Sequence, residues 1–445
     1  MKETIIQFGE GNFLRAFVDY FVDDMNKQGL YDGKVVVVQP LAGGLVHMLN
    51  DQTCKYNLFL RGVEKGEAID KHVEVESISR GIDPYKDFDA YMALAENPDL
   101  RFVVSNTTEA GIEFIGNEKL ADRPAKSFPA KLTQLLARRF ELGLPGFIFL
   151  PCELIDDNAV YLKRYILQYA ELWELGPDFV RWINEENHFS NTLVDRITTG
   201  YPRDNIQEFQ ARCSFEDKLV DTAEIFYLWV IEGNYEDELP LQAAGLNVVW
   251  TEDVKPYKKR KVRILNGGHT SLVTGALLYD MVTVGECLEN ETVRAYLEHN
   301  LFNEIVPTLG NTEVDVQFAK DVLERFANPF VKHRLDSIVL NSVAKFETRV
   351  LPTILEHKEL FGNYPQGLVM SLAALIAFYR TDAVKDMPEV VAFMKSASVE
   401  EILRHKEYWK LDLSDLYPMV NEYYELIQNS GMQAAYDKVL QSACC

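Results

Sequence analysis

The sequence predicts an α/β domain with a mostly parallel sheet, followed by a mainly α-helical domain. Residues 4–8 form a short, strand-like run that ends in a glycine turn and leads into an amphipathic helical pattern. Up to about residue 250, short apolar runs alternate with helical patterns, as in parallel sheets that are buried on both faces. Beyond residue 255 the strand signals fade and helical periods dominate. We therefore expect one domain over residues 1–255 and a second over residues 256–445.

The first strand and its turn have the form that opens a Rossmann-like dinucleotide-binding unit. Gly9 and Gly11 allow a tight turn and the close approach of a pyrophosphate to a helix N-terminus, whose free N–H groups favour an anion. Leu14 stands in place of the third glycine of the fingerprint, so this turn alone leaves a cofactor site and an ordinary turn equally open. In the helix that follows, Arg15 and Asp19 take the side opposite the apolar residues. The predicted cofactor-binding residues of the turn are Phe8, Gly9, Glu10, Gly11, Asn12, Phe13 and Leu14.

Two further strands end at the same predicted edge of the sheet. Residues 35–38 are four valines and predict the second strand of the domain. In NAD enzymes an acidic residue commonly ends this strand and binds the adenosine ribose, whereas here Gln39 follows it. Because no Arg or Lys comes directly afterwards to hold a 2′-phosphate, we expect NAD rather than NADP. Thr107 follows the apolar run 102–105, where a cofactor contact and a helix cap are both open.

Lys261, Asn266 and His269 form a polar trio just beyond the expected domain boundary. At 100° per residue on an α-helix, Asn266 lies about 140° from Lys261 and His269 about 80° from it, so all three point into one half of the helix. A lysine can exchange a proton with a secondary alcohol while a hydride leaves the same carbon, and an amide or imidazole can stabilise the oxyanion. A basic helix start with a capping histidine is the alternative. Burial and like charges would lower the lysine pKa from about 10.4, and the like charges are Lys258, Lys259, Arg260 and Arg263.

Two neighbouring features support a site at this trio. Gly267 and Gly268 interrupt a helical pattern, where each glycine costs roughly 1 kcal/mol relative to alanine, so we expect a flat group such as a nicotinamide ring to pack there. Asn191 lies at a predicted turn and could complete a two-amide oxyanion site with Asn266.

The composition excludes several classes of partner. The net charge of −23 argues against nucleic acid and against anionic membrane surfaces. The longest largely apolar run, 368–378, is too short to span a bilayer, and the six scattered cysteines show no zinc-ligand spacing. We therefore expect a cytoplasmic protein without a structural metal. The basic run 255–263 leaves room for an anionic substrate.

Three motifs, in this order, resemble the mannitol dehydrogenase family over nearly the whole chain. They are the segments 9–16, 191–197 and 261–269. The resemblance implies a metal-independent, NAD(H)-linked reaction in which Lys261 is the general acid/base and Asn191 and Asn266 are the oxyanion amides. It also implies that His269 positions the substrate and that Lys345 binds it. Four stretches, 105–112, 127–136, 151–156 and 265–270, are most similar to members that interconvert the hexuronate tagaturonate and the aldonate altronate.

The sequence departs from the family pattern at two positions. Lys258 stands where sugar-alcohol members can carry a glutamate, and Ser337 where some carry an arginine. Both changes put an uncharged polyol substrate in doubt. Our hypothesis is that Lys258 or Lys345 pairs with a substrate carboxylate, and a solvated surface charge is the alternative for Lys258. Fructuronate reduction, a mannitol-type dehydrogenase and a catalytically silent NAD-binding sensor remain the rival functions.

Overall fold

A computed structural model describes residues 1–108 and 110–442, which divide into two compact units. The first unit comprises Met1–Arg61 and Ile69–Lys255, and the second comprises Gly62–Ala68 and Pro256–Cys445. The segment Gly62–Ala68 is the tip of the hairpin formed by β3 and β4, so this tip groups with the second unit although it lies early in the chain.

A parallel six-stranded sheet forms the centre of the first unit, as expected, with the order β5-β2-β1-β6-β7-β8. Alternate residues of β1 enter different cores: Ile5 lies in one apolar cluster and Ile6 in the other. The sheet is therefore buried on both faces, which explains its continuous apolar strands. In chain order the strands are β1 (Lys2–Phe8), β2 (Gly33–Val38), β5 (Ile78–Ile82), β6 (Phe102–Ser105), β7 (Ile148–Pro151) and β8 (His188–Phe189).

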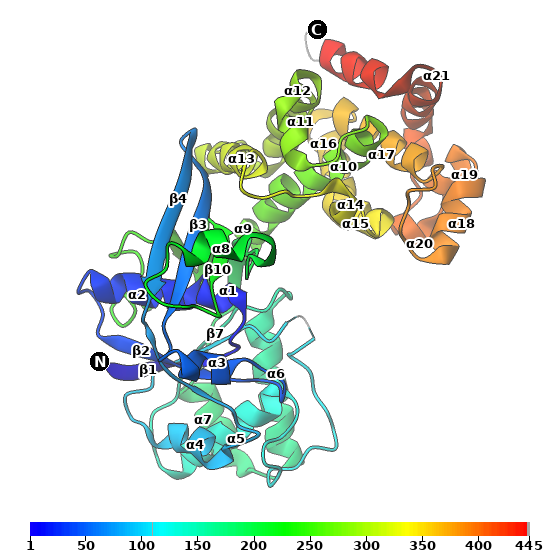
Figure 1. Cartoon of the computed structure of the whole chain (residues 1–445). Coiled ribbons are helices and arrows are strands. Elements are labelled where there is room, and N and C mark those ends of the chain that lie inside the picture. The colour runs from blue at the N-terminus through cyan, green and yellow to red at the C-terminus, as the bar shows by residue number, and fades with distance from the viewer. Residues whose placement is uncertain (109, 443–445) are drawn as a thin grey trace. The chain divides into compact units, whose positions relative to one another are not determined.

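Helices cover both faces of this sheet, α1 and α2 on one side of β1 and β2 and α4, α5 and α7 on the other (Figure 1). The N-terminus of α5 is capped by the Ser127 hydroxyl, which accepts from the N–H of Ala130. The bounds are α1 (Asn12–Arg15), α2 (Val18–Lys27), α3 (Val46–Asp51), α4 (Phe88–Met92), α5 (Phe128–Glu141), α6 (Asn158–Leu172), α7 (Gly176–Glu185) and α8 (Ile206–Gln210).

Two small sheets, which the sequence did not predict, complete the unit. One has the order β10-β3-β4, and the other has the order β12-β11-β9, in which β9 runs antiparallel to β11. β4 ends at Val75 in one of these small sheets, and β5 begins at Ile78 in the large sheet. The strands are β3 (Tyr56–Glu64), β4 (Glu67–Val75), β9 (Thr192–Asp195), β10 (Asp221–Glu224), β11 (Leu228–Glu232) and β12 (Val248–Thr251).

The helix after the glycine turn is broken, in contrast to the single amphipathic helix that the sequence suggests. The hydroxyl of Tyr56 donates to the carbonyl of Arg15 at 2.6 Å, and the guanidinium of Arg196 donates to the carbonyl of Ala16 at 2.6 Å. Because side chains take these two carbonyls, α1 ends at Arg15 and α2 starts anew at Val18.

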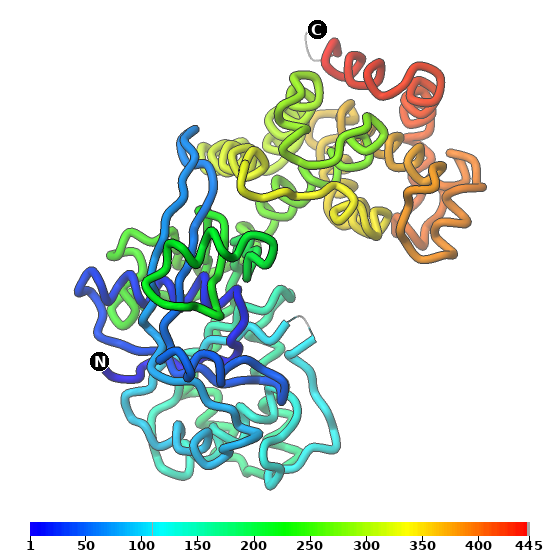
Figure 2. Tube along the Cα trace, viewed as in Figure 1, coloured from blue at the N-terminus to red at the C-terminus, as the bar shows by residue number. Residues whose placement is uncertain are grey.

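The second unit is helical throughout its C-terminal part, and its trace in Figure 2 runs as successive coils from yellow-green to red. Its centre is α17, which is buried on all sides and packs against α10 and α21. Three separate helices, α14, α15 and α16, follow one another between residues 335 and 361. The bounds are α9 (Lys255–Lys261), η3 (Val262–Asn266), α10 (Gly267–Leu278), α11 (Val284–Glu289), α12 (Glu291–His299), η4 (Asn300–Ile305), α13 (Glu313–Phe326), α14 (Leu335–Ile338), α15 (Ser342–Arg349), α16 (Leu351–Phe361), α17 (Gln366–Phe378), α18 (Pro388–Ser396), α19 (Val399–Leu403), α20 (Lys406–Trp409) and α21 (Tyr417–Ser442).

Candidate functional site

A pocket of about 340 Å³ lies in the first unit at the carboxyl ends of β1, β2 and β6. Open parallel sheets bind their ligands in a crevice at this edge. The glycine turn, the loop after β2, the loop after β6 and the start of α5 form its walls. Its lining includes Gly9, Glu10, Gly11, Leu41, Thr107 and Lys126.

The first glycine of the turn is required by the local geometry. Gly9 has a φ of +119°, a conformation that side chains disfavour. A Cβ at this position would lie 2.8 Å from the carbonyl oxygen of Asn106, which belongs to the loop after β6. The turn can therefore pack against that loop only with glycine at this position, and the backbone is left open towards the pocket.

Four of the predicted cofactor residues line this pocket, namely Gly9, Glu10, Gly11 and Thr107. The N–H and hydroxyl of Thr107 donate to the carboxylate of Glu153 at 3.0 and 2.9 Å. Glu153 is fully buried, and burial raises the pKa of its carboxyl group. The buried carboxylate of Glu153 thus holds the Thr107 backbone in place, and no pattern in the sequence points to this acid.

The other five predicted cofactor residues do not line the pocket. Phe8 and Leu14 are buried in the two cores, and the ring of Phe13 stacks on Phe17 at 4.9 Å. The amide of Gln39 is also buried and donates to the carbonyl of Leu41 at 2.7 Å, which shapes the loop after β2. The fifth, Asn12, is held by Arg15. These side chains act on the shape of the turn, and a direct cofactor contact for each of them stays a prediction.

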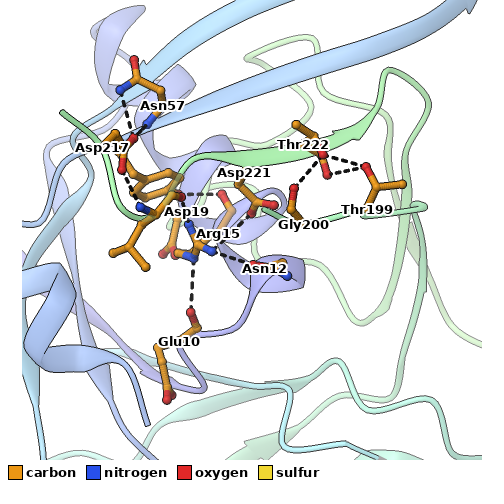
Figure 3. A network of polar contacts seen from close by, with 12 residues as sticks. Glu10, Asn12, Arg15, Asp19, Asn57, Thr199, Gly200, Asp217, Asp221 and Thr222 are labelled. Carbon is orange, nitrogen blue, oxygen red and sulfur yellow. Dashed lines mark hydrogen bonds and ion pairs between the residues drawn. The ribbon is translucent and has the colours of Figure 1, made fainter. Parts of the chain in front are cut away.

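Arg15 holds the glycine turn from behind (Figure 3). Its guanidinium donates to the carbonyl of Glu10 at 3.2 Å, to the side-chain oxygen of Asn12 at 2.6 Å and to the carbonyl of Leu219 at 2.5 Å. It also lies 3.9 Å from the buried carboxylate of Asp221. The polar side of α1 and α2, which carries Arg15 and Asp19, is therefore buried as well. It can be buried because its polar groups have partners inside the domain.

Asn191 directly precedes β9 and is buried in the first unit. Its side-chain amide donates to the carboxylate of Glu232 at 2.9 Å, and its side-chain oxygen accepts from the N–H of Ala159 at 3.1 Å. A primary amide carries two donor hydrogens, so one remains after the bond to Glu232. Glu232 is the orienting partner that sequence reasoning missed, and no spacing in the sequence points to it.

The segment from Lys261 to Asn266 is not regular α-helix. Lys261 ends α9, a π-helical turn spans Val262–Asn266, and α10 begins at Gly267. Hydrogen bonds in a π turn span five residues, and such turns are frequent at functional sites. The angle of about 140° between Lys261 and Asn266, which assumes an α-helix, is therefore too large. The wider turn brings residues five apart closer to one face.

The basic residues around Lys261 are mostly paired with acids. Lys259 and Arg263 lie 3.1 and 3.2 Å from the carboxylate of Glu356. Arg260 pairs with Asp315 at 2.6 Å.

These three cations share the two carboxylates of Glu356 and Asp315, so part of their positive charge is compensated. Burial lowers the pKa of Lys258, and the charge of Lys261 lowers it further. The lowered pKa expected for Lys261 itself stays a prediction.

His269 is buried in the second unit, where its ring stacks on Phe326 at 3.9 Å and meets the edge of His333 at 4.9 Å. Burial holds the pKa of His269 well below its usual range, and the charges of His333, Arg325, Arg349 and Lys345 lower it further. The imidazole is therefore neutral near pH 7. Its Nε2 atom has no hydrogen-bond partner within the described residues.

Contacts with protein atoms explain why glycine occupies positions 267 and 268. A Cβ on Gly267 would lie 3.1 Å from the carbonyl oxygen of Arg349, and one on Gly268 would lie 3.3 Å from Leu301. The end of α15 and the π-helical turn η4 therefore pack so closely against this helix that a Cβ at either position would push a neighbour aside by a few tenths of an ångström. These contacts account for the two glycines, and a flat cofactor group beside them stays a prediction.

The two predicted substrate lysines both lie in the second unit. Lys345 is on α15, where its amine donates to the carbonyl of Ile338 at 2.7 Å, and Lys258 is on α9. Asn191 and Asn266 belong to different units, so their pairing in one oxyanion site stays a prediction.

Over residues 1–108 and 110–442, no three His, Cys, Asp or Glu side chains converge as metal ligands. No helix in the described part of the chain is long and apolar enough to cross a bilayer.

Two family models match successive parts of the chain. The mannitol dehydrogenase Rossmann domain matches residues 3–242, and the mannitol dehydrogenase C-terminal domain matches residues 253–429. Among solved structures, the fold is similar to a D-sorbitol dehydrogenase in its substrate-free form, with a TM-score of 0.87 and 22% identity over 98% of this chain and 95% of that one. A mannitol 2-dehydrogenase from Pseudomonas fluorescens, in a ternary complex with NAD and D-mannitol, gives a TM-score of 0.73 and 20% identity over 99% of this chain and 95% of that one.

Full-length relatives are more similar in sequence. An altronate oxidoreductase from Bacillus subtilis (strain 168) is 42% identical, over 98% of this chain and 95% of its own. An altronate oxidoreductase from Phocaeicola vulgatus is 43% identical, over 97% and 95%. Both family models and these relatives cover nearly all of the sequence, in the order that the two units follow. The chain therefore belongs to the mannitol dehydrogenase family of oxidoreductases.

Proposed function

We propose that the protein is an NAD(H)-dependent oxidoreductase that interconverts tagaturonate and altronate. The observation that carries this proposal is the identity of 42–43% to relatives named altronate oxidoreductase over 97–98% of the chain. Lys345 and Arg349 on α15 of the second unit favour a substrate with a carboxylate over an uncharged polyol.

The pocket at the glycine turn fits a dinucleotide. The backbone of Gly9 and Gly11 lines it, and it lies at the edge of the sheet where such cofactors bind. Glu10 lines the pocket and accepts from the N–H of Leu45 at 2.9 Å, and burial raises the pKa of Glu10. Glu10 and Gln39, which directly follows β2, carry no positive charge for a 2′-phosphate, and this supports NAD.

In the proposed reaction the bound dinucleotide supplies the hydride to the ketone carbon. Lys261 gives a proton to the carbonyl oxygen as it becomes an alcohol, and takes that proton back in the oxidation. Asn266 and the free amide hydrogen of Asn191 donate to the same oxygen while it carries negative charge. The neutral His269 positions the substrate through a hydrogen bond.

An NADH-oxidation assay against tagaturonate, fructuronate, fructose and fructose 6-phosphate tests this proposal. We expect the highest kcat/KM for tagaturonate, because the relatives act on altronate by name and the second unit carries unpaired positive charge. A preference for fructuronate or fructose would support the epimeric reductase or a mannitol-type dehydrogenase. NADH binding without turnover of any of the four would support a sensor.

A further inference from the structure

Arg349 ends α15 in the second unit and is half-buried. Burial lowers the pKa of its guanidinium, and no carboxylate in the described part of the chain offsets this effect. Two other arginines of this unit are paired: Arg260 with Asp315 at 2.6 Å and Arg263 with Glu356 at 3.2 Å. No comparable ion pair or side-chain hydrogen bond of Arg349 occurs within residues 1–108 and 110–442. The guanidinium is thus half-buried, has no acidic partner among the described residues and is available to an anion supplied from outside.

The position of Arg349 places it beside the predicted chemistry. Its carbonyl oxygen lies 3.1 Å from where a Cβ of Gly267 would be, so the end of α15 packs directly against the residue after Asn266. Lys345 precedes Arg349 by four residues, so both side chains leave α15 on the same face.

Lys345 is already engaged, in contrast to Arg349. Its amine donates to the carbonyl of Ile338 at 2.7 Å. Burial and the charge of Arg349 lower the pKa of Lys345, and the carboxylate of Asp386 raises it by less. Some family members are expected to carry an arginine where this chain has Ser337. The Ser337 hydroxyl donates to the carbonyl of Arg334 at 2.7 Å. Of Ser337, Lys345 and Arg349, only Arg349 has a cationic side chain that is not already hydrogen-bonded to described residues.

His269 gives an independent indication of a ligand. It is 9% exposed, and its Nε2 atom lacks a hydrogen-bond partner among the described residues. A buried polar atom without a partner is rare in folded proteins and calls for an explanation. The charges that act on this ring include those of Arg325, Arg349 and Lys345. An unpaired hydrogen-bonding group in such surroundings is suited to a polar ligand with negative charge.

We propose that Arg349 binds the carboxylate of the sugar-acid substrate, while the imidazole of His269 hydrogen-bonds to the substrate nearby. This assignment rests on the proposed function and names the residue that selects an acid over an uncharged ketose. A guanidinium presents N–H groups in a planar fork that matches both oxygens of a carboxylate, whereas a lysine acts as a point charge.

The test compares Arg349→Gln, Arg349→Lys and the unchanged protein on tagaturonate and on the ketose that carries CH₂OH in place of the carboxylate. We expect Arg349→Gln to lower kcat/KM for tagaturonate by roughly ten- to a hundredfold, mainly through KM, the scale for a lost hydrogen bond to a charged group. Turnover of the uncharged ketose should stay within about twofold. Arg349→Lys should restore part of the preference, because it keeps the charge without the fork.

Arg404→Gln is the matched control, because Arg404 is exposed and pairs with Glu400 at 2.7 Å. It should leave both substrates unchanged. Equal losses on both substrates in Arg349→Gln, or an unchanged preference, would overturn the assignment.

If the unchanged protein does not reduce tagaturonate, the proposed function itself fails. Calorimetric titration with altronate then decides about Arg349 separately. The assignment stands if the unchanged protein binds altronate and Arg349→Gln weakens that binding at least tenfold. It falls if the two proteins bind equally or if neither binds.

Discussion

Lys261 is the residue on which the proposed proton transfer depends. Lys261→Ala should lower turnover of tagaturonate by at least about a hundredfold, the scale of general acid/base catalysis, while the Kd for NADH stays within about twofold. Steady-state kinetics and NADH fluorescence titration measure the two effects.

Lys259 offers a control for this substitution, since it lies two residues away and pairs with Glu356 at 3.1 Å. Lys259→Ala should leave turnover within about twofold. Near-normal turnover in Lys261→Ala would remove the assignment of the acid/base.

At the scale of elements, the glycine turn between β1 and α1 determines the shape of the cofactor pocket. Gly9→Ala should raise the Kd for NADH at least tenfold, because the added Cβ meets the carbonyl of Asn106 at 2.8 Å and the φ of +119° disfavours a side chain. Fluorescence titration with NADH gives the Kd.

Gly116→Ala is the corresponding control in the same unit, since its Cβ would have only an ordinary contact at 3.6 Å. It should bind NADH as the unchanged protein does. Unaltered NADH affinity in Gly9→Ala would show that the cofactor does not use this turn.

The π turn between α9 and α10 is the second element that bears on the site. Sequence periodicity placed Lys261, Asn266 and His269 on one helix, and the structure keeps them on consecutive helical turns. Periodicity alone could not show the wider turn, because one π-helical turn changes the angle between residues without changing which residues are apolar.

At the scale of the whole molecule, buried carboxyl groups make stability depend on pH. Burial raises the pKa of Asp19 to about 7 from 3.8, so the folded protein holds a proton that the unfolded chain releases. This contribution to stability is full below about pH 4 and is lost as the pH rises towards 7. Asp19→Asn removes the titration. The free energy of unfolding of the variant, minus that of the unchanged protein, should therefore increase from pH 4 to 7 and then level off.

Urea unfolding followed by circular dichroism at several pH values measures this difference. Asp89→Asn is the control, because the Asp89 side chain is 83% exposed. The corresponding difference for Asp89→Asn should stay nearly constant over the same range. A flat difference for Asp19→Asn would show that Asp19 does not titrate in this range.

The sequence by itself determined the parallel sheet, the glycine turn, the change to helices near residue 255 and the position of Lys261 in the chain. These features depend on local patterns of apolar residues and on glycine, which act over a few positions. Only the tertiary structure decided that Glu232 holds Asn191, that α15 and η4 explain Gly267 and Gly268, and that Arg349 has no acidic partner among the described residues. Each of these facts depends on which distant segments meet, and contacts between segments far apart in the chain leave no periodic signal in the sequence.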